Sequence, residues 1–498
     1  MKTGPAAALA LATLAACSST DPPAEAPAPA EVTFPKGFLW GSATAAFQVE
    51  SGSVHTDWWH WAKQPGKIQG GAHPDVGGAD ALAHVDDDIK ALKDSGQNAY
   101  RFSIEWSRVY PTRESFDQNT PDPAALAAYD GLLAKLRAAS LVPVVTLQHF
   151  ALPEWLTDVA RWSAPYGWER PEIVDLFAEW ARRAGARWGK DVDYWVTINE
   201  PVNVVLGGYV AGLFPPGALL NVDRGLQVVR AEANAHAKAF EALHAADTID
   251  ADGDGKASLV SMAFHMRTFH PKDASDDDDK AAAERTRHLW NQWLLDALVK
   301  GDVDDDFDGT LTGPKDRKGD ATLAGHLDWI GVNYYSDTII AAGGGIKVPV
   351  INAVVLQDDL PTGRPRTDFG WDIYPEGFRT VLNEAKAYGL PLMVTENGLA
   401  DDGDKNRARF LAEHLYQMGR AIQDGAKIIG YMHWSLVDNF EWASGYCPKF
   451  GLYRVNADGS RTARPSVQSY RAIIESGKVT RAAIDALPAY APPPQRCR

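Results

Sequence analysis

Eight short apolar runs, each followed by a longer segment with helical periodicity, constrain the fold of this chain more than any other feature. The runs cover residues 38–44, 98–104, 142–148, 194–200, 258–265, 328–335, 392–398 and 427–435. Helical segments between them include residues 124–139, 171–188, 281–298 and 407–424. Nearly continuous apolar strands are typical of a parallel sheet that is covered on both faces. Eight strand–helix units predict an α/β fold, the closed (β/α)8 TIM barrel.

An open, doubly wound parallel sheet is the alternative arrangement of alternating strands and helices. That fold usually carries a G-x-G-x-x-G turn after its first strand, and no such pattern follows residues 38–44. The sequence contains no second linker and no repeat of 20–50 residues beyond residue 31. We therefore expect a single catalytic barrel domain over residues 32–480, followed by a C-terminal tail at 481–498.

The N-terminal residues have the composition of an export signal rather than of a folded domain. A single lysine precedes an Ala/Leu-rich run at residues 6–16, which is too short to span a bilayer as a helix. The run ends in Leu14-Ala15-Ala16-Cys17, which resembles a bacterial lipobox. We expect residues 1–16 to be a signal peptide and Cys17 to be lipidated. The alternative is a plain secretory signal cleaved after an A-x-A-like site.

A lipidated Cys17 would begin a Pro/Ala-rich tether at residues 17–31, since this composition cannot form a core. Ser18 after the cysteine suggests, by resemblance to bacterial sorting signals, an outer-membrane lipoprotein facing the periplasm or the cell surface. The lipid anchor would be the chain's sole contact with the membrane. The net charge of −16 argues against a nucleic-acid partner, because the phosphate backbone attracts lysine and arginine. With three cysteines there is no disulfide framework, and whether Cys447 and Cys497 pair stays open.

Polar and aromatic side chains stand at the ends of the expected strands. In order along the chain, the runs contain or lead into Gln48, Arg101, His149, Asn199-Glu200, Asn333-Tyr334-Tyr335, Glu396-Asn397 and His433-Trp434. One polar residue at a strand end is usually a loop residue with a structural role. Seven such ends converge on one mouth of a barrel, at the C-terminal face where barrel enzymes have their active sites.

Two carboxylates at one mouth, Glu200 and Glu396, are what glycoside hydrolysis requires. One must be protonated to deliver a proton to the leaving oxygen, and the other must be ionised to attack the anomeric carbon. Because two close carboxylates cannot both ionise easily, one pKa rises and the other falls. Arg101, a fixed cation near the same mouth, is placed to keep one of the pair charged.

Five motifs in the expected order resemble those of family 1 glycoside hydrolases, and the likeness extends from Phe34 to about Tyr470. The motifs are FPKGFLWG from Phe34, YRFS from Tyr100, TINEP from Thr197, VTENG from Val394 and WSLVDNFEW from Trp434. The resemblance implies a retaining exo-β-glycosidase of the β-glucosidase type that needs no cofactor for catalysis. Its substrates would be β-linked sugars or aryl and alkyl β-glycosides.

The resemblance also implies residue roles, with Glu200 as general acid/base and Glu396 as nucleophile. Arg101 and Tyr335 would bond Glu396 and keep it ionised. The sugar would be bound by Gln48, His149, Asn199, Tyr335, Trp434, Glu441, Trp442 and Phe450.

Two positions depart from patterns found in the family and one agrees with its usual pattern, and all three bear on the substrate. Phe150 stands where many relatives carry Trp, and this difference bears on the preference among gluco, galacto and fuco sugars. Glu441, Pro448 and Phe450 occupy the places of the Ser, Lys and Tyr of the 6-phospho-β-glycosidase branch, which predicts no phosphate pocket. Glu200 is not replaced by Gln, which argues against a myrosinase-like enzyme.

Two acidic loops have the D-x-D-x-D-G spacing of a calcium loop, in which alternate carboxylates converge on one hard cation. The candidate ligands are Asp250, Asp252 and Asp254 in the first loop and Asp304, Asp306 and Asp308 in the second. Neither loop has the glutamate of an EF-hand at position twelve, and a solvated acidic turn is the alternative. The sequence thus predicts a structural calcium ion, on the face of the barrel opposite the active site.

Two rival functions share most of these features. A glycosyl-transferring relative would pass the covalent sugar to another alcohol instead of water, and the first half-reaction is common to both. A surface-tethered sugar-binding protein with a dead site is the rival from another class. The intact pair Glu200 and Glu396 argues against it.

Overall fold

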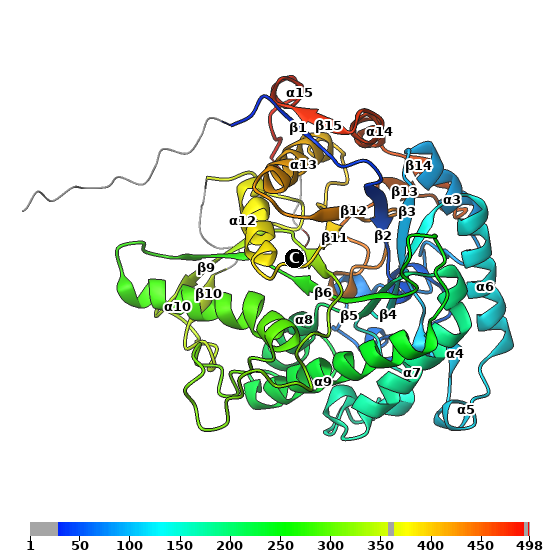
Figure 1. Cartoon of the computed structure of the whole chain (residues 1–498), viewed down its shortest axis with the longest axis vertical. Coiled ribbons are helices and arrows are strands. Elements are labelled where there is room, and N and C mark those ends of the chain that lie inside the picture. Colours follow the sequence, from blue (N-terminus) through cyan, green and yellow to red (C-terminus); the bar gives the residue numbers. More distant parts are fainter. Residues whose placement is uncertain (1–27, 357–362, 493–496, 498) are drawn as a thin grey trace, which may run out of the picture.

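The computed structural model describes residues 28–356, 363–492 and 497, and a closed barrel of parallel strands lies at its centre (Figure 1). Around the barrel the strand order is β11-β12-β2-β3-β4-β5-β6-β8. These strands are β2 Leu39–Ala43, β3 Ala99–Ser103, β4 Val142–Gln148, β5 Tyr194–Asn199, β6 Leu259–His265, β8 Ile330–Asn333, β11 Leu392–Asn397 and β12 Ile428–Trp434. Each lies within one of the eight apolar runs, so the prediction of a (β/α)8 barrel is confirmed.

A ring of helices covers the outside of the barrel, with one main helix after each strand (Figure 1). The ring consists of α3 Val85–Asp94, α6 Pro123–Ala138, α7 Ile173–Trp188, α9 Val222–Ala246, α10 Asp277–Arg287, α12 Pro375–Lys386, α13 Arg407–Gln423 and α14 Ser466–Ser476. Local chemistry sets where they begin. The side chain of Asp122 accepts hydrogen bonds from the backbone N–H groups of Ala124 and Ala125, and Pro123 occupies the first turn of α6.

The helix expected at residues 281–298 is longer and less regular than its periodicity suggests. Helix α10 begins at Asp277 and is followed by a π-helical turn at His288–Gln292, the short α11 at Trp293–Leu295 and a second π-helical turn at Asp296–Lys300. Apolar spacing alone does not distinguish these turns from a continuous α-helix.

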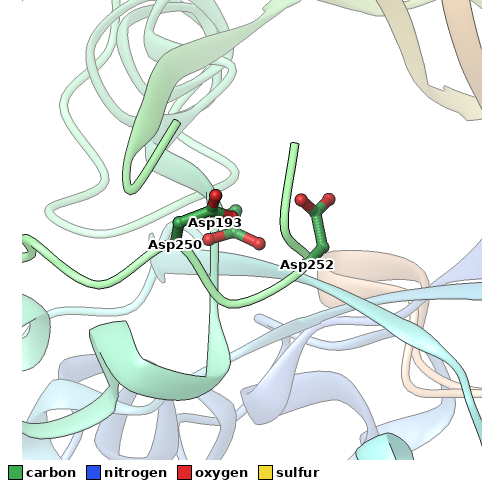
Figure 2. Close-up of side chains that lie close together, drawn as sticks. All are labelled: Asp193, Asp250 and Asp252. Atoms are coloured by element: carbon green, nitrogen blue, oxygen red, sulfur yellow. The ribbon is translucent and has the colours of Figure 1, made fainter. Parts of the chain in front are cut away.

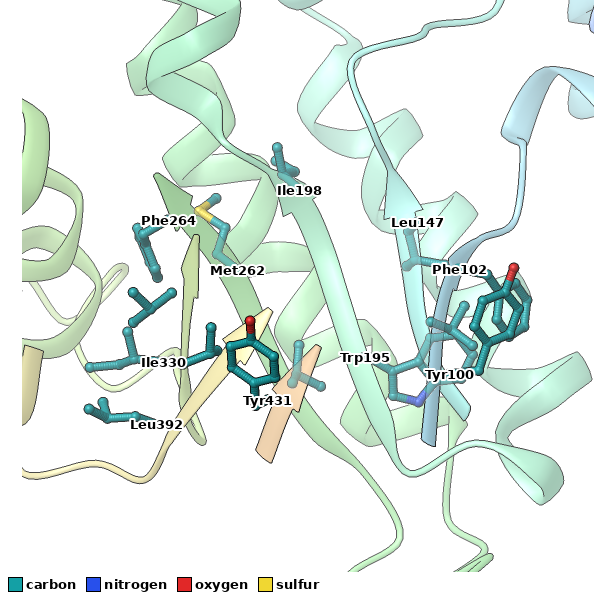
Figure 3. Packing of buried hydrophobic residues seen from close by; sticks show 14 of the residues in the cluster. Tyr100, Phe102, Leu147, Trp195, Ile198, Met262, Phe264, Ile330, Leu392 and Tyr431 are labelled. Carbon is teal, nitrogen blue, oxygen red and sulfur yellow. The ribbon is translucent and has the colours of Figure 1, made fainter. Parts of the chain in front are cut away.

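Side chains on the strands alternate between two apolar layers. Tyr100 and Phe102 of β3 point outward into the layer between strands and helices, where Trp195 and Tyr431 also lie (Figure 3). Ala99 of the same strand belongs to the inner cluster. Because strand side chains alternate, Arg101 must face the barrel interior with Ala99. This alternation brings Arg101 to the contact with Glu396 that is described below.

Smaller elements decorate the barrel. Strand β1 Glu31–Thr33 pairs antiparallel with β15 Lys478–Thr480, so the two ends of the barrel domain lie side by side. The remaining strands form a sheet of β7 Thr268–Pro271, β9 Asp337–Ala341 and β10 Val354–Leu356 and a hairpin of β13 Tyr453–Val455 and β14 Arg461–Ala463. The remaining α-helices are α1 Ala46–Val49, α2 Asp57–Ala62, α4 Trp106–Val109, α5 Arg113–Asp117, α8 Pro201–Val205 and α15 Arg481–Asp485.

The expected signal peptide at residues 1–16, Cys17 and most of the tether at 17–31 lie outside the described residues. Within the described part of the chain, none of the helices has the length and apolar character needed to cross a membrane. The pairing of Cys447 and Cys497, which the sequence left open, is resolved because the two residues form a disulfide.

Candidate active site

Two buried carboxylates, Glu200 and Glu396, lie at the C-terminal ends of barrel strands. Strand β5 ends at Asn199, and Glu200 follows it in a left-handed conformation with φ of 47° before helix α8 begins. Glu396 is part of β11, and the two residues are 5% and 3% exposed. Asn333, at the end of β8, donates its Nδ2 to Oε1 of Glu200 at 2.7 Å and also lowers the pKa of Glu396. A single amide therefore links both carboxyl groups.

Glu396 is held by two donors, one on each oxygen. Nη1 of Arg101 lies 2.6 Å from Oε1, and the Tyr335 hydroxyl lies 2.7 Å from Oε2. Arg101 is fully buried, and its Nη1 also donates to the carbonyl oxygen of Thr395 at 3.0 Å. Burial outweighs the Arg101 cation and the Tyr335 hydroxyl, which both lower the pKa of Glu396, so this pKa is raised and does not fall as expected for one member of the pair. These contacts favour the ionised form that a nucleophile needs.

Glu200 has no cation in contact with either oxygen among the described residues. Burial raises its pKa, and the charge of Glu396 raises it further. The amides of Asn333 and Asn203, which donate to its two oxygens, lower the pKa less than burial raises it. Glu200 is thus the member of the pair that keeps its proton, as a general acid requires.

A chain of polar contacts extends from Glu396 to His149. Nη2 of Arg101 donates to Oδ1 of Asn199 at 2.7 Å, and Nδ2 of Asn199 lies 3.2 Å from Nε2 of His149. Burial, and after it the Arg101 charge, lowers the pKa of His149 well below its usual value. The neutral ring accepts from Asn199 at Nε2, so its Nδ1 carries the hydrogen. Nδ1 has no partner in the described part of the chain and can donate to a sugar hydroxyl.

The expected sugar-binding residues converge beside this chain. Nε2 of Gln48 donates to the Phe440 carbonyl oxygen at 3.0 Å and to Oε2 of Glu441 at 3.4 Å. This leaves Oε1 of Gln48 buried without a partner among the described residues. Burial, followed by the charges of Glu396 and Glu200, raises the pKa of Glu441 to about 8. Both side chains therefore have hydrogen-bonding capacity that is left for a ligand.

Aromatic rings form two walls around these polar groups. The His149 ring stacks with Trp434 at 5.8 Å and with Trp442 at 6.0 Å between ring centroids. Phe450 contacts Tyr335 at 6.1 Å, with the two rings edge to face. Flat apolar faces beside hydrogen-bonding groups match a pyranose ring, which has C–H faces and hydroxyl edges.

The structure thus brings together all ten residues that the sequence assigned to catalysis and sugar binding. It adds Asn333 and Asn203, which both bond Glu200, and it adds Phe369 and Trp371, which pack against Phe450. Asn333 stands at the end of an apolar run, so its position was a usable signal. Phe369 and Trp371 lie on a loop outside the barrel strands, where no periodicity marks them.

A glycine directly after β11 allows this strand and its neighbour β12 to approach closely. A Cβ atom on Gly398 would lie 1.8 Å from the carbonyl oxygen of Trp434. A side chain at this distance would clash with the carbonyl oxygen. The third residue of the Glu396-Asn397-Gly398 segment must therefore be glycine for a steric reason. This close approach brings the end of β12, where Trp434 stands, against the segment that follows Glu396.

The first acidic loop brings together a different set of carboxylates from the one predicted. Asp250 and Asp252 converge with Asp193, and one oxygen of each lies within 4.8 Å of the others (Figure 2). The predicted third ligand, Asp254, is outside this group and accepts from the backbone N–H of Lys256. Asp193 directly precedes β5 and is far from the loop in sequence. The spacing of residues within the loop therefore could not reveal that Asp193 belongs to the group.

The predicted ligands of the second acidic loop also differ from the carboxylates that the structure brings together. Asp304 and Asp306 converge with Asp316, whereas Asp308 accepts from the backbone N–H of Thr310. The two loops form separate groups rather than one shared site. The first lies beside Asp193 at the N-terminal end of β5, at the opposite end of the barrel from Glu200 as expected. The second precedes β8 but folds back along the side of the barrel, where Asp304 contacts His288 and Phe307 lines a cavity with Val202 of α8, so the expected position of this loop is wrong.

Comparison with known proteins agrees with this geometry. The chain matches the family model described as "Glycosyl hydrolase family 1" over residues 30–479. It is 33% identical to a protein named beta-galactosidase from Pyrococcus woesei, over 90% of this chain and 98% of that protein. It is 32% identical to beta-glucosidase A of Thermotoga maritima, over 85% of this chain and 93% of that protein.

Solved structures give the same result. A family 1 β-glucosidase from Thermotoga maritima superposes with a TM-score of 0.77 at 28% identity, covering 90% of this chain and 99% of that chain. The β-glycosidase of Thermosphaera aggregans superposes with a TM-score of 0.79 at 26% identity, covering 92% of this chain and 100% of that chain. Both likenesses extend over the whole barrel.

Proposed function

The chain belongs to glycosyl hydrolase family 1, and from that membership we propose that it hydrolyses terminal β-D-glucosides by double displacement. The observation that carries the proposal is the unequal environment of the two carboxyl groups. Glu396 has a guanidinium and a hydroxyl on its oxygens, while Glu200 has two neutral amides. One buried pair therefore supplies an anion and an acid at the same mouth.

In the first half-reaction the Glu396 carboxylate attacks the anomeric carbon while Glu200 transfers its proton to the leaving oxygen. The aglycone leaves as an alcohol, and the sugar stays bound to Glu396 through an ester. In the second half-reaction the Glu200 carboxylate takes a proton from water, whose oxygen attacks the same carbon. Glu396 leaves, and two inversions give the β-anomer.

The remaining polar groups would orient the sugar ring. Asn199, held by Arg101, contacts the 2-hydroxyl, a bond that strengthens as the oxocarbenium-like transition state forms. Gln48, Glu441 and His149 bond the other hydroxyls through the donors and acceptors that they leave free. Trp434 provides the floor on which the ring stacks.

β-Glucosides are the leading substrates, and β-galactosides or β-fucosides are also cleaved. Gln48 and Glu441 can bond hydroxyls of either C4 epimer, and relatives are named for both glucosidase and galactosidase activity. Substrates with a 6-phosphate are poor, because the added anion would meet Glu441 and Phe450 instead of a cation.

The test is a panel of nitrophenyl β-glycosides that differ in the glycone, combined with NMR of the first product. We expect the glucoside to be cleaved with the highest kcat/KM and β-glucose to appear before mutarotation. Glu396→Ala should nearly abolish turnover, and azide should restore part of it as an α-glycosyl azide. An α-anomer from the wild-type enzyme would overturn the mechanism. A high yield of sugar transferred to an added alcohol would favour the transglycosylating relative.

We further propose that the enzyme is exported and anchored through a lipid on Cys17. The support is the sequence Leu14-Ala15-Ala16-Cys17 and the Pro/Ala-rich segment that follows it. Cys17→Ser should move the protein from the membrane fraction to the soluble fraction. Membrane fractionation that is unchanged in this variant would contradict the proposal.

A further inference from the structure

The disulfide between Cys447 and Cys497 joins the C-terminal end of the chain to the loop that carries two sugar-binding residues. The two Cα atoms are 5.6 Å apart, and 50 residues separate the cysteines in sequence. Cys447 follows Glu441 and Trp442 within one short loop. Cys497 is 8% exposed, so it is packed against the protein rather than extended into solvent.

Cys447 is connected to Glu441 by consecutive backbone hydrogen bonds. The N–H of Cys447 donates to the carbonyl oxygen of Ser444 at 3.3 Å, and the N–H of Ser444 donates to that of Glu441 at 2.9 Å. The N–H of Glu441 in turn donates to the carbonyl oxygen of Gly445 at 2.7 Å. A displacement of Cys447 is therefore transmitted through one tight turn to the sugar-binding carboxyl group.

Cys497 is fastened to the opposite wall of the site. Its backbone N–H donates to the carbonyl oxygen of Asp368 at 2.9 Å. The next residue, Phe369, packs on Trp371 at 4.4 Å between ring centroids. Trp371 contacts Tyr335, the residue that bonds the nucleophile, at 5.5 Å. The disulfide thus couples the loop of Glu441 to the aromatic wall that supports Tyr335.

We propose that Cys447 and Cys497 are positioning residues whose disulfide sets the distance between Glu441 and this aromatic wall and so sets the affinity for the sugar. The proposal rests on the proposed glycosidase function. In the oxidised enzyme Glu441 is held where it meets the sugar hydroxyls. A dithiol reductant converts the disulfide to two thiols and is itself oxidised to a cyclic disulfide. The loop then keeps other contacts, among them the hydrogen bond from the Tyr446 hydroxyl to the Pro74 carbonyl oxygen at 2.9 Å and the one from the Asp401 N–H to the Lys449 carbonyl oxygen at 3.0 Å.

The two catalytic carboxylates do not depend on the disulfide. Glu200 and Glu396 follow or belong to barrel strands and are bonded by Asn333, Arg101 and Tyr335. Reduction should therefore act on binding more than on chemistry. We expect KM for nitrophenyl β-glucoside to rise by about 3- to 10-fold, the effect of one weakened hydrogen bond, while kcat stays within about twofold.

The experiment measures kcat and KM well below the melting temperature, for the full chain before and after treatment with a dithiol, with free thiols counted. Cys497→Ser and Cys447→Ser should each reproduce the raised KM without reductant. The double variant should no longer respond to the dithiol. Cys17→Ser, which leaves this disulfide intact, is the matched control and should respond as the wild type does.

Three results would overturn the proposal. KM could stay constant although the thiol count rises by two, or kcat could fall with KM unchanged. In the third, the double variant would respond to the dithiol as strongly as the wild type. A loss of melting temperature with unchanged KM would mean that the disulfide only stabilises the fold. If the oxidised enzyme cleaves no β-glycoside at all, the proposed function fails instead, and the two failures are distinguishable.

Discussion

Nη1 of Arg101 lies 2.6 Å from Oε1 of Glu396, and this contact joins the second strand of the barrel to the seventh across its interior. Neither side chain has significant contact with solvent, since Arg101 is fully buried and Glu396 is 3% exposed. Arg101 reaches this position because side chains alternate along β3. Arg101 therefore contributes to the stability of the fold as well as to the reaction, because burying the Glu396 carboxylate without a cation would be costly.

Removing this cation should impair the nucleophile. In Arg101→Met the pKa of Glu396 rises, because the contribution that lowered it is gone. The acidic limb of kcat/KM requires ionised Glu396, so it should move to higher pH. At neutral pH kcat/KM should fall by about 10- to 150-fold, the equivalent of one charge-assisted hydrogen bond. The measurement is a pH profile of nitrophenyl β-glucoside hydrolysis.

Arg461→Met is the matched control for that variant. Arg461 also forms a buried pair, with its Nε 2.7 Å from Oδ1 of Asp88, but the pair joins β14 to α3 outside the mouth. Its loss should lower stability without moving the acidic limb. An unchanged pH profile in Arg101→Met would contradict the role that we assign to the cation.

The pKa of Glu200 should depend on the charge of Glu396. Burial raises that pKa, and the neighbouring carboxylate raises it further, so the basic limb of kcat/KM falls as pH rises through the raised value. In Glu396→Gln the neighbouring charge is absent, and the pKa of Glu200 should decrease. Glu441, whose pKa is raised to about 8 by burial and then by the same charges, should shift in the same direction.

Carbon-13 NMR titration of the glutamate carboxyl groups measures both shifts directly. Glu50 provides the internal reference, because burial also raises its pKa but Glu396 is not among the causes. A Glu200 titration that is identical in wild type and Glu396→Gln would show that burial alone sets its protonation.

Most of the fold and of the catalytic site could be predicted from the sequence. Barrel strands are buried on both faces, so each is a continuous apolar run that local composition reveals. Glu200 and Glu396 stand at the C-terminal ends of these runs, so the sequence places both carboxyl groups at one mouth before their contacts are known, whereas their separate roles come from the family resemblance. The same reasoning reached Arg101, which the alternation along one strand directs inward.

What the sequence did not reveal depends on contacts between distant segments. Asp193 joins the first acidic loop from the preceding strand connection, and Asp316 joins the second from a later turn. Cys497 meets Cys447 across 50 residues. Trp371 lies on a loop without periodicity. In each case the pairing follows from how barrel loops meet in space, which no spacing within one loop encodes.

Glu232 of α9 is a buried acid without a role in this mechanism. It is fully buried, and both of its carboxyl oxygens are without a hydrogen-bond partner among the described residues. Burial raises its pKa well above the usual value, so the folded protein holds this proton to higher pH than the unfolded chain does. The free energy of unfolding should therefore decrease as pH rises from about 4.3 through the raised pKa.

Glu232→Leu should remove both the cost of burying an unpartnered polar group and the loss of stability as pH rises. Replacing the unpartnered polar group should raise the free energy of unfolding by about 1–3 kcal/mol at neutral pH, with a larger gain at pH 9. Glu232→Gln should remove the pH dependence but keep the cost of a buried polar group. Urea unfolding at pH 5, 7 and 9 tests these expectations. A leucine variant that is less stable than the wild type at every pH would contradict them.

A cation at the first acidic loop would relieve a specific electrostatic cost. Asp193 is 4% exposed, and burial, followed by the charges of Asp252 and Asp250, raises its pKa to about 7. A calcium ion that binds only the folded state would stabilise it by roughly 2.7 kcal/mol at a hundredfold excess over its Kd. For a domain of this size that is a rise in melting temperature of roughly 3 °C. We therefore expect a chelator to lower the melting temperature and added calcium to restore it.

Two variants separate a calcium site from a solvated acidic turn. Asp252→Ala removes a carboxylate of the cluster and should abolish the response to chelator and calcium. Asp254→Ala is the matched control from the same loop, because its carboxylate lies outside the cluster, and it should respond as the wild type does. Early-time activity at low temperature should change in neither, since the loop lies at the opposite end of the barrel from Glu200. A melting temperature that changes with neither chelator nor calcium would show that the loop is an acidic turn. Protonation would then reduce the repulsion between Asp193 and the neighbouring carboxylates.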